Sequence, residues 1–212
     1  MKRLVAQALF NSYSYLEYRK VITDLIAEGK ATGQNQSKEL LDYSILNEAR
    51  MKRLDKTLEV PERIASKLKT LKKEYIWLVI AEGWCGDAAQ ILPVLNKMAC
   101  ETNKIKLKII FRDANDEVMN QYLTNGARAI PKMLLIDKES GKVCDHWGPR
   151  PKGAVVLINN YKEQFGKIDD EAKTQLQLWY LHDKGLSVQN EVVEKIYSIK
   201  ECENENLLNQ YK

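Results

Sequence analysis

The sequence predicts an α/β sandwich built on one sheet. Residues 75–81 form a continuous apolar run of β-favouring residues, which is too short for a buried helix of ordinary length and typical of a central strand. Helical and strand patterns follow the order helix, strand, helix, strand, helix, strand, strand, helix around this run, as in a sheet covered by helices. At 212 residues, the chain is long enough for one such domain with helical additions.

Three helices are predicted ahead of this strand. Residues 14–28 carry apolar side chains at near-helical spacing, and Gly29 ends the pattern as a helix stop. Ser37 is expected to cap a second helix with an apolar face, and Pro61 to open a third that runs to about Lys73. The first two helices lie outside the sheet pattern, so they need a partner surface for their apolar faces.

The rest of the chain continues the alternation and ends in further helices. The elements predicted after the first strand are a helix at 86–102, a strand at 106–111, a short helix at 117–123, strands at 133–137 and 142–147, and helices at 154–165, 169–182 and 188–199. Pro93 should kink the first of these helices, and the turn at 139–141 indicates an antiparallel hairpin between the last two strands. The polar tail 200–212 is expected to fray.

Composition argues against several classes of protein. The chain has 33 basic and 29 acidic residues and no run near the ~20 apolar residues of a membrane span, so neither nucleic acid nor a membrane is expected as a partner. Four irregularly spaced cysteines without a Cys-x-x-Cys pair predict no disulfide framework, which fits a reducing, cytoplasmic location. The basic, apolar start lacks the length and the cleavage site of a signal peptide. His146 and His182 have no ligand-spaced partners, so we expect no metal and no cofactor.

A cysteine lies in the loop 84–88, which reads Trp-Cys-Gly-Asp-Ala and joins the central strand to a helix. Unpaired N–H groups and the dipole at a helix start favour a thiolate, so Cys85 is the candidate catalytic residue. The residue three positions on is Ala88, so the loop holds no second sulfur. The sequence therefore predicts chemistry with one thiol.

Four features in order resemble the thioredoxin family over residues 59–165. They are the Trp84-Cys85-Gly86 start of the active-site loop, Pro93 where that family kinks its helix, the segment Gly126-Ala127-Arg128-Ala129-Ile130-Pro131, and Gly148 after the final strand. The resemblance implies a thioredoxin-like three-layer α/β/α sandwich with a central mixed sheet. It divides the chain into an N-terminal helical extension (1–58), a thioredoxin-like domain (59–166) and a C-terminal helical extension packed on the core (167–212).

The resemblance also implies a substrate groove beside Cys85. Pro131 would follow a cis peptide bond and face the sulfur, which would turn the N–H and C=O of Ile130 toward an extended peptide. Gly148 would border this groove. From the residues alone, the alternative is that Pro131 only starts a strand.

Two departures from the family remove the step that clears a mixed disulfide. Ala88 stands where the family has its resolving cysteine, and Val79 stands where it has a buried aspartate that assists that cysteine. Cys100 is 15 residues along the same helix, ~22 Å away and beyond the ~7 Å limit of a disulfide, so it is expected in the core. Cys144 is expected as a small buried residue, and Cys202 could reach the site only if the tail folds back.

Charged and aromatic residues surround the candidate thiol. Asp87 suits the start of a helix but opposes ionisation of Cys85, so the direction of the thiol's pKa shift stays open. Arg128 and Arg150 are candidates for binding an anionic ligand, such as the carboxylates of a small thiol. The alternative for both arginines is a local ion pair or exposure to solvent. Trp84 is a candidate for a wall of the groove, and core packing is the alternative for it.

Three functions remain open from the sequence. The first is monothiol exchange, in which a mixed disulfide at Cys85 is resolved by a low-molecular-weight thiol or a cysteine-containing protein. The second is a non-catalytic module that binds an extended peptide in the groove. The third, an iron–sulfur cluster held through one cysteine, is disfavoured by the carboxylate of Asp87 beside the sulfur.

Overall fold

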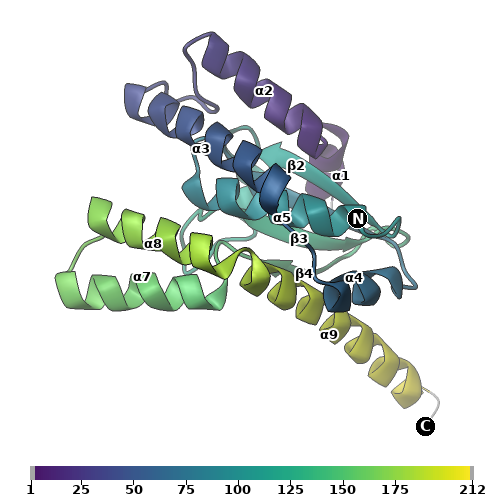
Figure 1. Ribbon diagram of the computed structural model, residues 1–212. Helices are drawn as coiled ribbons and strands as arrows, with labels where there is room; N and C mark the ends of the chain where they lie inside the picture. The colour runs from purple at the N-terminus through teal and green to yellow at the C-terminus, as the bar shows by residue number, and fades with distance from the viewer. Residues whose placement is uncertain (1–2, 211–212) are drawn as a thin grey trace.

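The protein has one four-stranded mixed sheet within the residues that the structure describes (Figure 1). The computed structural model describes residues 3–210, and side chains through residue 199. The strands are β1 (Tyr75–Ala81), β2 (Ile105–Phe111), β3 (Lys132–Asp137) and β4 (Val143–Trp147), in the spatial order β2-β1-β3-β4. β1 is parallel to β2 and antiparallel to β3, and β3 and β4 form an antiparallel hairpin. The predicted α/β sandwich with a mixed sheet is confirmed.

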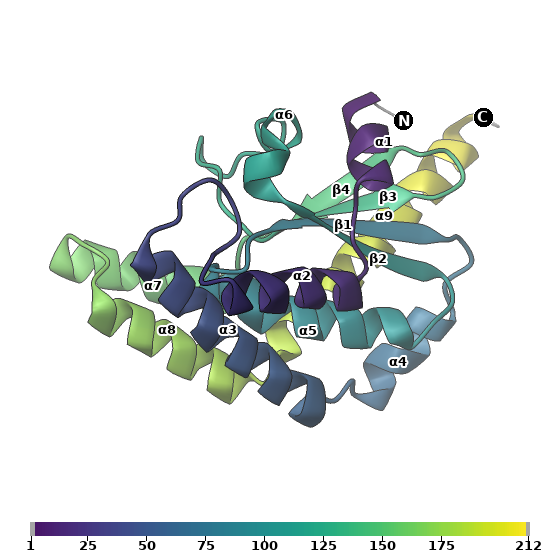
Figure 2. The same cartoon turned by 90° about the horizontal axis from the view of Figure 1, so that it is seen from above.

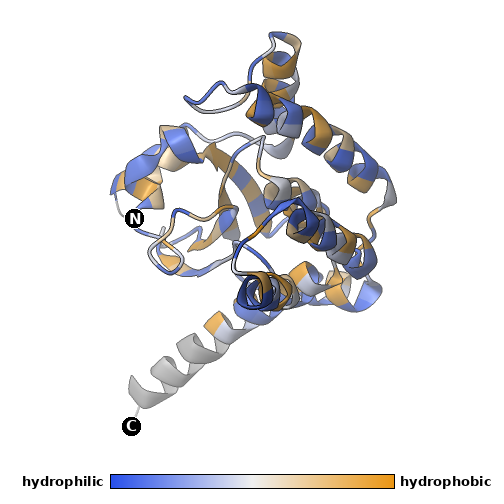
Figure 3. Ribbon diagram, turned by 90° about the vertical axis from the view of Figure 1, so that its left-hand side faces the viewer, coloured by the Kyte–Doolittle hydropathy of each residue, from blue (hydrophilic) through white to orange (hydrophobic). Residues whose placement is uncertain are grey.

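Helices form the two outer layers. They are α1 (Arg3–Phe10), α2 (Tyr15–Ala27), α3 (Lys38–Thr57), α4 (Glu62–Lys69), α5 (Gly86–Cys100), the 3₁₀ helix η1 (Arg112–Ala114), α6 (Asp116–Met119), α7 (Lys152–Phe165), α8 (Asp170–Asp183) and α9 (Leu186–Gln210). Figure 2 shows α1 and α6 on one face of the sheet and α5 on the other. Figure 3 shows hydrophobic and hydrophilic residues mixed along the helices, as expected when one side of a helix packs on a core.

Several helix boundaries differ from the sequence expectations. α4 stops before Thr70 and short of the expected end at Lys73, because the Thr70 hydroxyl donates to a backbone carbonyl and competes with a further turn. α6 is shorter than the predicted helix 117–123, since the chain then closes a tight β-bridge at 124–127. α9 continues through much of the tail 200–212, and α1 was not predicted.

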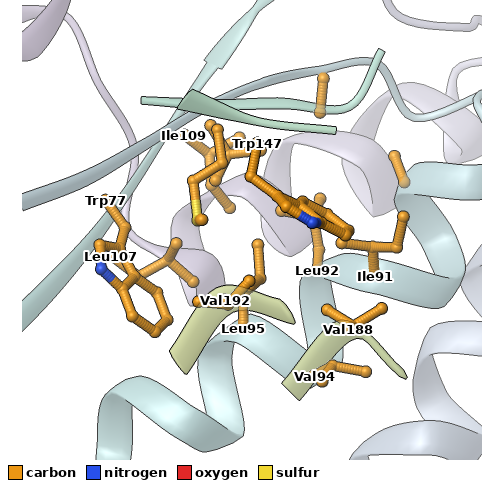
Figure 4. Close-up of a cluster of buried hydrophobic side chains, with 14 of the residues drawn as sticks. Trp77, Ile91, Leu92, Val94, Leu95, Leu107, Ile109, Trp147, Val188 and Val192 are labelled. Atoms are coloured by element: carbon orange, nitrogen blue, oxygen red, sulfur yellow. The ribbon is translucent and has the colours of Figure 1, made fainter. Parts of the chain in front are cut away.

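The core between the sheet and α5 is apolar (Figure 4). The labelled side chains are Trp77, Leu107, Ile109 and Trp147 from the strands, Ile91, Leu92, Val94 and Leu95 from α5, and Val188 and Val192 from α9. Full burial of one such side chain contributes about 1.5–3 kcal/mol to the free energy of unfolding. α9 packs on α5 and β4, whereas α7 packs mainly on α8. The start of α9 therefore completes the layer that covers this face of the sheet.

The N-terminal helices are attached to α5 and to the edge strand β2. α3 packs along α5, and α2 packs on α3 and β2. Arg19 of α2 forms ion pairs with Glu48 and Asp55 of α3. Tyr13 and Ile109 exchange two backbone hydrogen bonds of 2.8 Å, which covers part of the edge of the sheet. The helices that needed a partner surface find it on these two elements.

The sheet topology brings the two parts of the predicted site together. β1 runs into the loop 82–85 and then into α5, so Cys85 follows the carboxyl end of β1. β3 runs in the opposite direction, and its first residue, Lys132, pairs with Ile80 near that end. Pro131, directly before β3, therefore lies beside the loop that carries Cys85.

Gly185 joins α8 to α9 at a close approach to α5. Its φ is +76°, and a Cβ placed there would lie 2.8 Å from Val94 Cγ2. Gly166, at the end of α7, has a similar φ of +73° but no atom within 4 Å of such a Cβ. We expect Gly166→Ala to cost about 1 kcal/mol of unfolding free energy through the backbone. Gly185→Ala should cost about 1–3 kcal/mol more, because the methyl group meets Val94.

Urea unfolding of both variants measures this difference. Equal losses of unfolding free energy would contradict close packing of the α8–α9 turn on α5.

Candidate functional site

Cys85 is the N-cap residue of α5 and follows the carboxyl end of the central strand β1. Its Sγ accepts a hydrogen bond from the Ala88 N–H at 3.5 Å, and its thiol donates to the carbonyl oxygen of Ile130 at 3.4 Å. The residue is only 9% exposed. The sulfur is therefore held between the first turn of α5 and the segment that precedes β3.

The segment opposite Cys85 contains a cis peptide bond between Ile130 and Pro131, and a second cis bond joins Gly148 to Pro149. A Cβ at Gly148 would lie 2.3 Å from the Pro131 carbonyl oxygen, and its φ of +106° also favours glycine. Ile130 is 7% exposed, and its carbonyl oxygen accepts from the Cys85 thiol. This bond takes up one of the two lone pairs of the carbonyl oxygen, so a peptide in the groove would share this acceptor with the thiol.

Asp87, in the first turn of α5, is held from two sides. Tyr180 of α8 donates its hydroxyl to Oδ1 at 2.8 Å, and Arg150 donates Nε to Oδ2 at 2.8 Å within an ion pair. The Asp87 side chain is 9% exposed. Arg150 is therefore committed to a carboxylate of the protein. Tyr180 was not predicted as a site residue, since its place in an apolar helical pattern indicated only core packing.

Burial and the negative charge of Asp87 raise the pKa of the Cys85 thiol to about 12. Backbone N–H groups of α5 and the positive charge of Arg150 lower the pKa, but by less. Burial, the largest cause, thus decides the direction that the sequence left open. The thiol is protonated at neutral pH.

Cys85 lines a pocket of about 340 Å³ between α3, α5 and α8. The predicted residues Trp84, Gly86, Asp87 and Arg150 line one part of it, and side chains of α3 and α8 line the rest. The contribution of α3 and α8 was not predicted, because apolar spacing shows that a helix is covered but not which surface it covers.

Two other predicted residues have separate partners. Trp84 donates its indole N–H to the Thr32 carbonyl oxygen at 3.1 Å, and the guanidinium of Arg112 lies 4.8 Å from its ring centre. Arg128 forms an ion pair with Asp116 of α6 and does not line the pocket. Trp84 therefore borders the thiol pocket, whereas Arg128 belongs to a local ion pair.

The other cysteines with described side chains lie outside this pocket. The expectation that Cys100 is a core residue is wrong, because the last residue of α5 is exposed. Cys144 was expected to be buried, but on the edge strand β4 it is only partly buried. The side chain of Cys202 lies outside the described residues.

A buried carboxyl group lies in the loop that precedes Cys85. Glu82 is fully buried, and its Oε1 accepts a hydrogen bond from the Asp113 N–H at 2.9 Å. Burial raises the pKa of Glu82 above its ordinary value. Val79 is also fully buried. Glu82 was not predicted as a site residue, although an acidic residue directly after a buried strand is an unusual feature.

Residues 3–199 contain no group of three or more His, Cys, Asp and Glu side chains that could hold a metal ion. The described helices include none that is long and apolar enough to cross a membrane. Among the residues described as lining the pocket, Cys85 is the one cysteine, so its thiol is the candidate nucleophile.

The chain matches a family model described as thioredoxin over residues 33–163, more than half of its length. It belongs to the thioredoxin family. The match begins in the loop before α3 and ends within α7, so it includes Cys85, the cis-proline segment and Gly148. Curated proteins gave no match.

Two solved structures share the thioredoxin-like fold. A protein of unknown function from Pseudomonas aeruginosa is 18% identical with a TM-score of 0.55, and an HIV epitope scaffold is 19% identical with a TM-score of 0.54. Each match covers 89% of this chain and 98% of the other, so helices outside the family segment are included. At these identities, the likeness shows the fold alone.

The pKa of Cys85 predicts an unusual pH profile for alkylation. Iodoacetamide reacts with the thiolate, so a pKa of about 12 should make the rate rise about tenfold per pH unit from pH 7 to 10 without a plateau. Peptide mass spectrometry measures the rate at Cys85, with free N-acetylcysteine as the reference. A plateau below pH 9 would contradict a buried, protonated thiol.

The charge of Asp87 should slow this reaction. Asp87→Asn keeps an oxygen that can accept from Tyr180 but removes the negative charge that raises the Cys85 pKa. We expect about tenfold faster alkylation at pH 8, which corresponds to about one pKa unit. Asp116→Asn makes the same charge change outside the pocket and should leave the rate unchanged. Equal rates in the two variants would show that Asp87 does not control the thiol.

Proposed function

We propose that the protein carries out thiol–disulfide exchange through Cys85 alone, as a single-cysteine member of its family. The Cys85 thiol loses its proton to solvent, and the thiolate attacks one sulfur of a disulfide. The S–S bond of the substrate breaks, a new bond joins Cys85 to one half, and the other half leaves as a thiolate. An external thiol then attacks the mixed disulfide and frees Cys85. That thiol is a low-molecular-weight thiol or a cysteine of a partner protein.

The observation that carries this proposal is the position of the sulfur. Cys85 lies at the start of α5, opposite the cis peptide bond before Pro131, and lines an open pocket. Ala88 stands where a resolving cysteine would be, and Cys100 is exposed at the other end of α5. Among the cysteines with described side chains, none lines the pocket with Cys85, so these residues support resolution by an external thiol, which a reducing cytoplasm would supply.

The high pKa sets a condition on the reaction. With a pKa of about 12, the thiolate fraction at pH 7 is ~10⁻⁵. The greater nucleophilicity of a more basic thiolate recovers part of this loss, which leaves ~100-fold lower reactivity than an ordinary thiol. Binding must then raise the effective concentration of the disulfide at the sulfur. We therefore expect selectivity for disulfides that the pocket holds.

Exposure to glutathione disulfide at pH 8, followed by intact-mass and peptide mass spectrometry, tests the proposal. We expect one glutathione adduct on Cys85 that added thiol removes. Cys85→Ser should lose this adduct, and Cys100→Ser, which changes an exposed cysteine outside the pocket, should retain it. Modification of Cys100 without modification of Cys85 would overturn the proposal.

A non-catalytic binding module is the second candidate, and the raised pKa of Cys85 favours it. In that case the protonated thiol only lines the pocket. Cys85→Ser separates the two candidates, because a binding module keeps its ligand when the sulfur is replaced by oxygen, whereas the covalent adduct is lost.

A further inference from the structure

Among the pocket's cations, Arg50 has no carboxylate partner within the described part of the chain. Arg150 is paired with Asp87, and Lys173 with Asp170. The Nη1 of Arg50 donates instead to a neutral amide oxygen, that of Asn47, at 2.9 Å. The guanidinium of Arg50 therefore keeps its capacity to bind an added anion.

The placement of Arg50 is coupled to the loop that carries Cys85. Asn47 is fully buried, and its Nδ2 donates to the carbonyl oxygen of Gly83 at 3.0 Å. This bond orients the amide so that its oxygen accepts from Arg50. Burial lowers the pKa of Arg50, so an anion beside it would offset part of the cost of burying the guanidinium.

Two hydrogen-bond donors lie over the residue that follows Cys85. A Cβ at Gly86 would lie 3.7 Å from Arg50 Nη1 and 3.5 Å from Gln177 Nε2. The Oε1 of Gln177 accepts from Gln90 Nε2 at 2.8 Å, which assigns the amide nitrogen to the side of Gly86. A guanidinium and an amide N–H₂ group thus converge on Gly86, in the same pocket that Cys85 lines.

The size and walls of the pocket suit a small ligand. Its volume of about 340 Å³ falls within the range of small-molecule sites. Tyr43, Trp84 and Leu176 add apolar surface, while the cations Arg50, Lys173 and Arg150 outnumber the single carboxylate in the lining.

We propose that the pocket binds a low-molecular-weight thiol or its disulfide through a carboxylate held by Arg50 and Gln177 beside Cys85. A guanidinium pairs with a carboxylate through charge-assisted hydrogen bonds, which are stronger than neutral ones. The choice of a sulfur-bearing ligand rests on the proposed exchange at Cys85. The binding of its carboxylate can be measured without that reaction.

The first experiment uses S-methylglutathione, a thioether that carries two carboxylates and cannot exchange. Calorimetry and tryptophan fluorescence should show saturable binding to the full chain, since Trp84 lines the pocket. Arg50→Gln should weaken binding ~10–100-fold through loss of a charge-assisted bond, and Arg50→Lys by less. Arg53→Gln is the matched control, because Arg53 is exposed on the same helix and does not line this pocket.

The second experiment compares disulfides of different charge at pH 8. Arg50→Gln should slow adduct formation from glutathione disulfide ~10–100-fold, but leave the rate with neutral hydroxyethyl disulfide unchanged. Cationic cystamine should react no more slowly with this variant than with the wild type. Thermal unfolding of each variant confirms that the fold is retained.

The outcomes separate the two proposals. Absence of S-methylglutathione binding at millimolar concentration, or equal slowing by Arg50→Gln for all three disulfides, would overturn the carboxylate site. Binding that depends on Arg50 without any adduct at Cys85 would support the site and overturn the exchange reaction.

Discussion

The carboxylate of Asp87 connects three segments that are far apart in the sequence. Its backbone belongs to the first turn of α5, while its oxygens bind Arg150, just before α7, and Tyr180 of α8. Leaving a buried charge unpaired costs about 3–5 kcal/mol, so these partners are required once Asp87 is inside. The same contacts place α8 beside Cys85 and thereby form a wall of the pocket. The electrostatics and the shape of the site therefore have a common origin.

Cys85 stands at a helix start, which favours a thiolate, but its thiol has a raised pKa. Burial and Asp87 outweigh the effect of the helix start and keep the sulfur protonated. A protonated thiol resists indiscriminate oxidation and alkylation. Chemistry at such a sulfur depends on a ligand that binds first, and the pocket beside Arg50 has the charge and the size for that step. Selectivity would then come from binding rather than from an activated thiol.

Features with a local cause could be read from the sequence. The run 75–81 is a strand because β-favouring apolar residues need burial on both faces, and Ser37 caps α3 because its hydroxyl accepts from the Leu40 N–H. Contacts between distant segments could not be read in this way. Cys100 was expected in the core because it lies too far along the helix to reach Cys85, but its side chain at the end of α5 is exposed. For Arg128, the structure shows the local pairing that the sequence left as an alternative, with Asp116 as the partner.

The sequence by itself determined that one sulfur stands at a strand-to-helix junction without a partner in its loop, because both facts depend on neighbours along the chain. The tertiary structure alone decided the state of that sulfur. Desolvation depends on what packs around Cys85, and α3 and α8 come from residues more than 25 positions away on either side. The same packing decided which cation is open to a ligand, since only the fold commits Arg150 to Asp87 and gives Arg50 an amide oxygen, not a carboxylate, as its partner among the described residues.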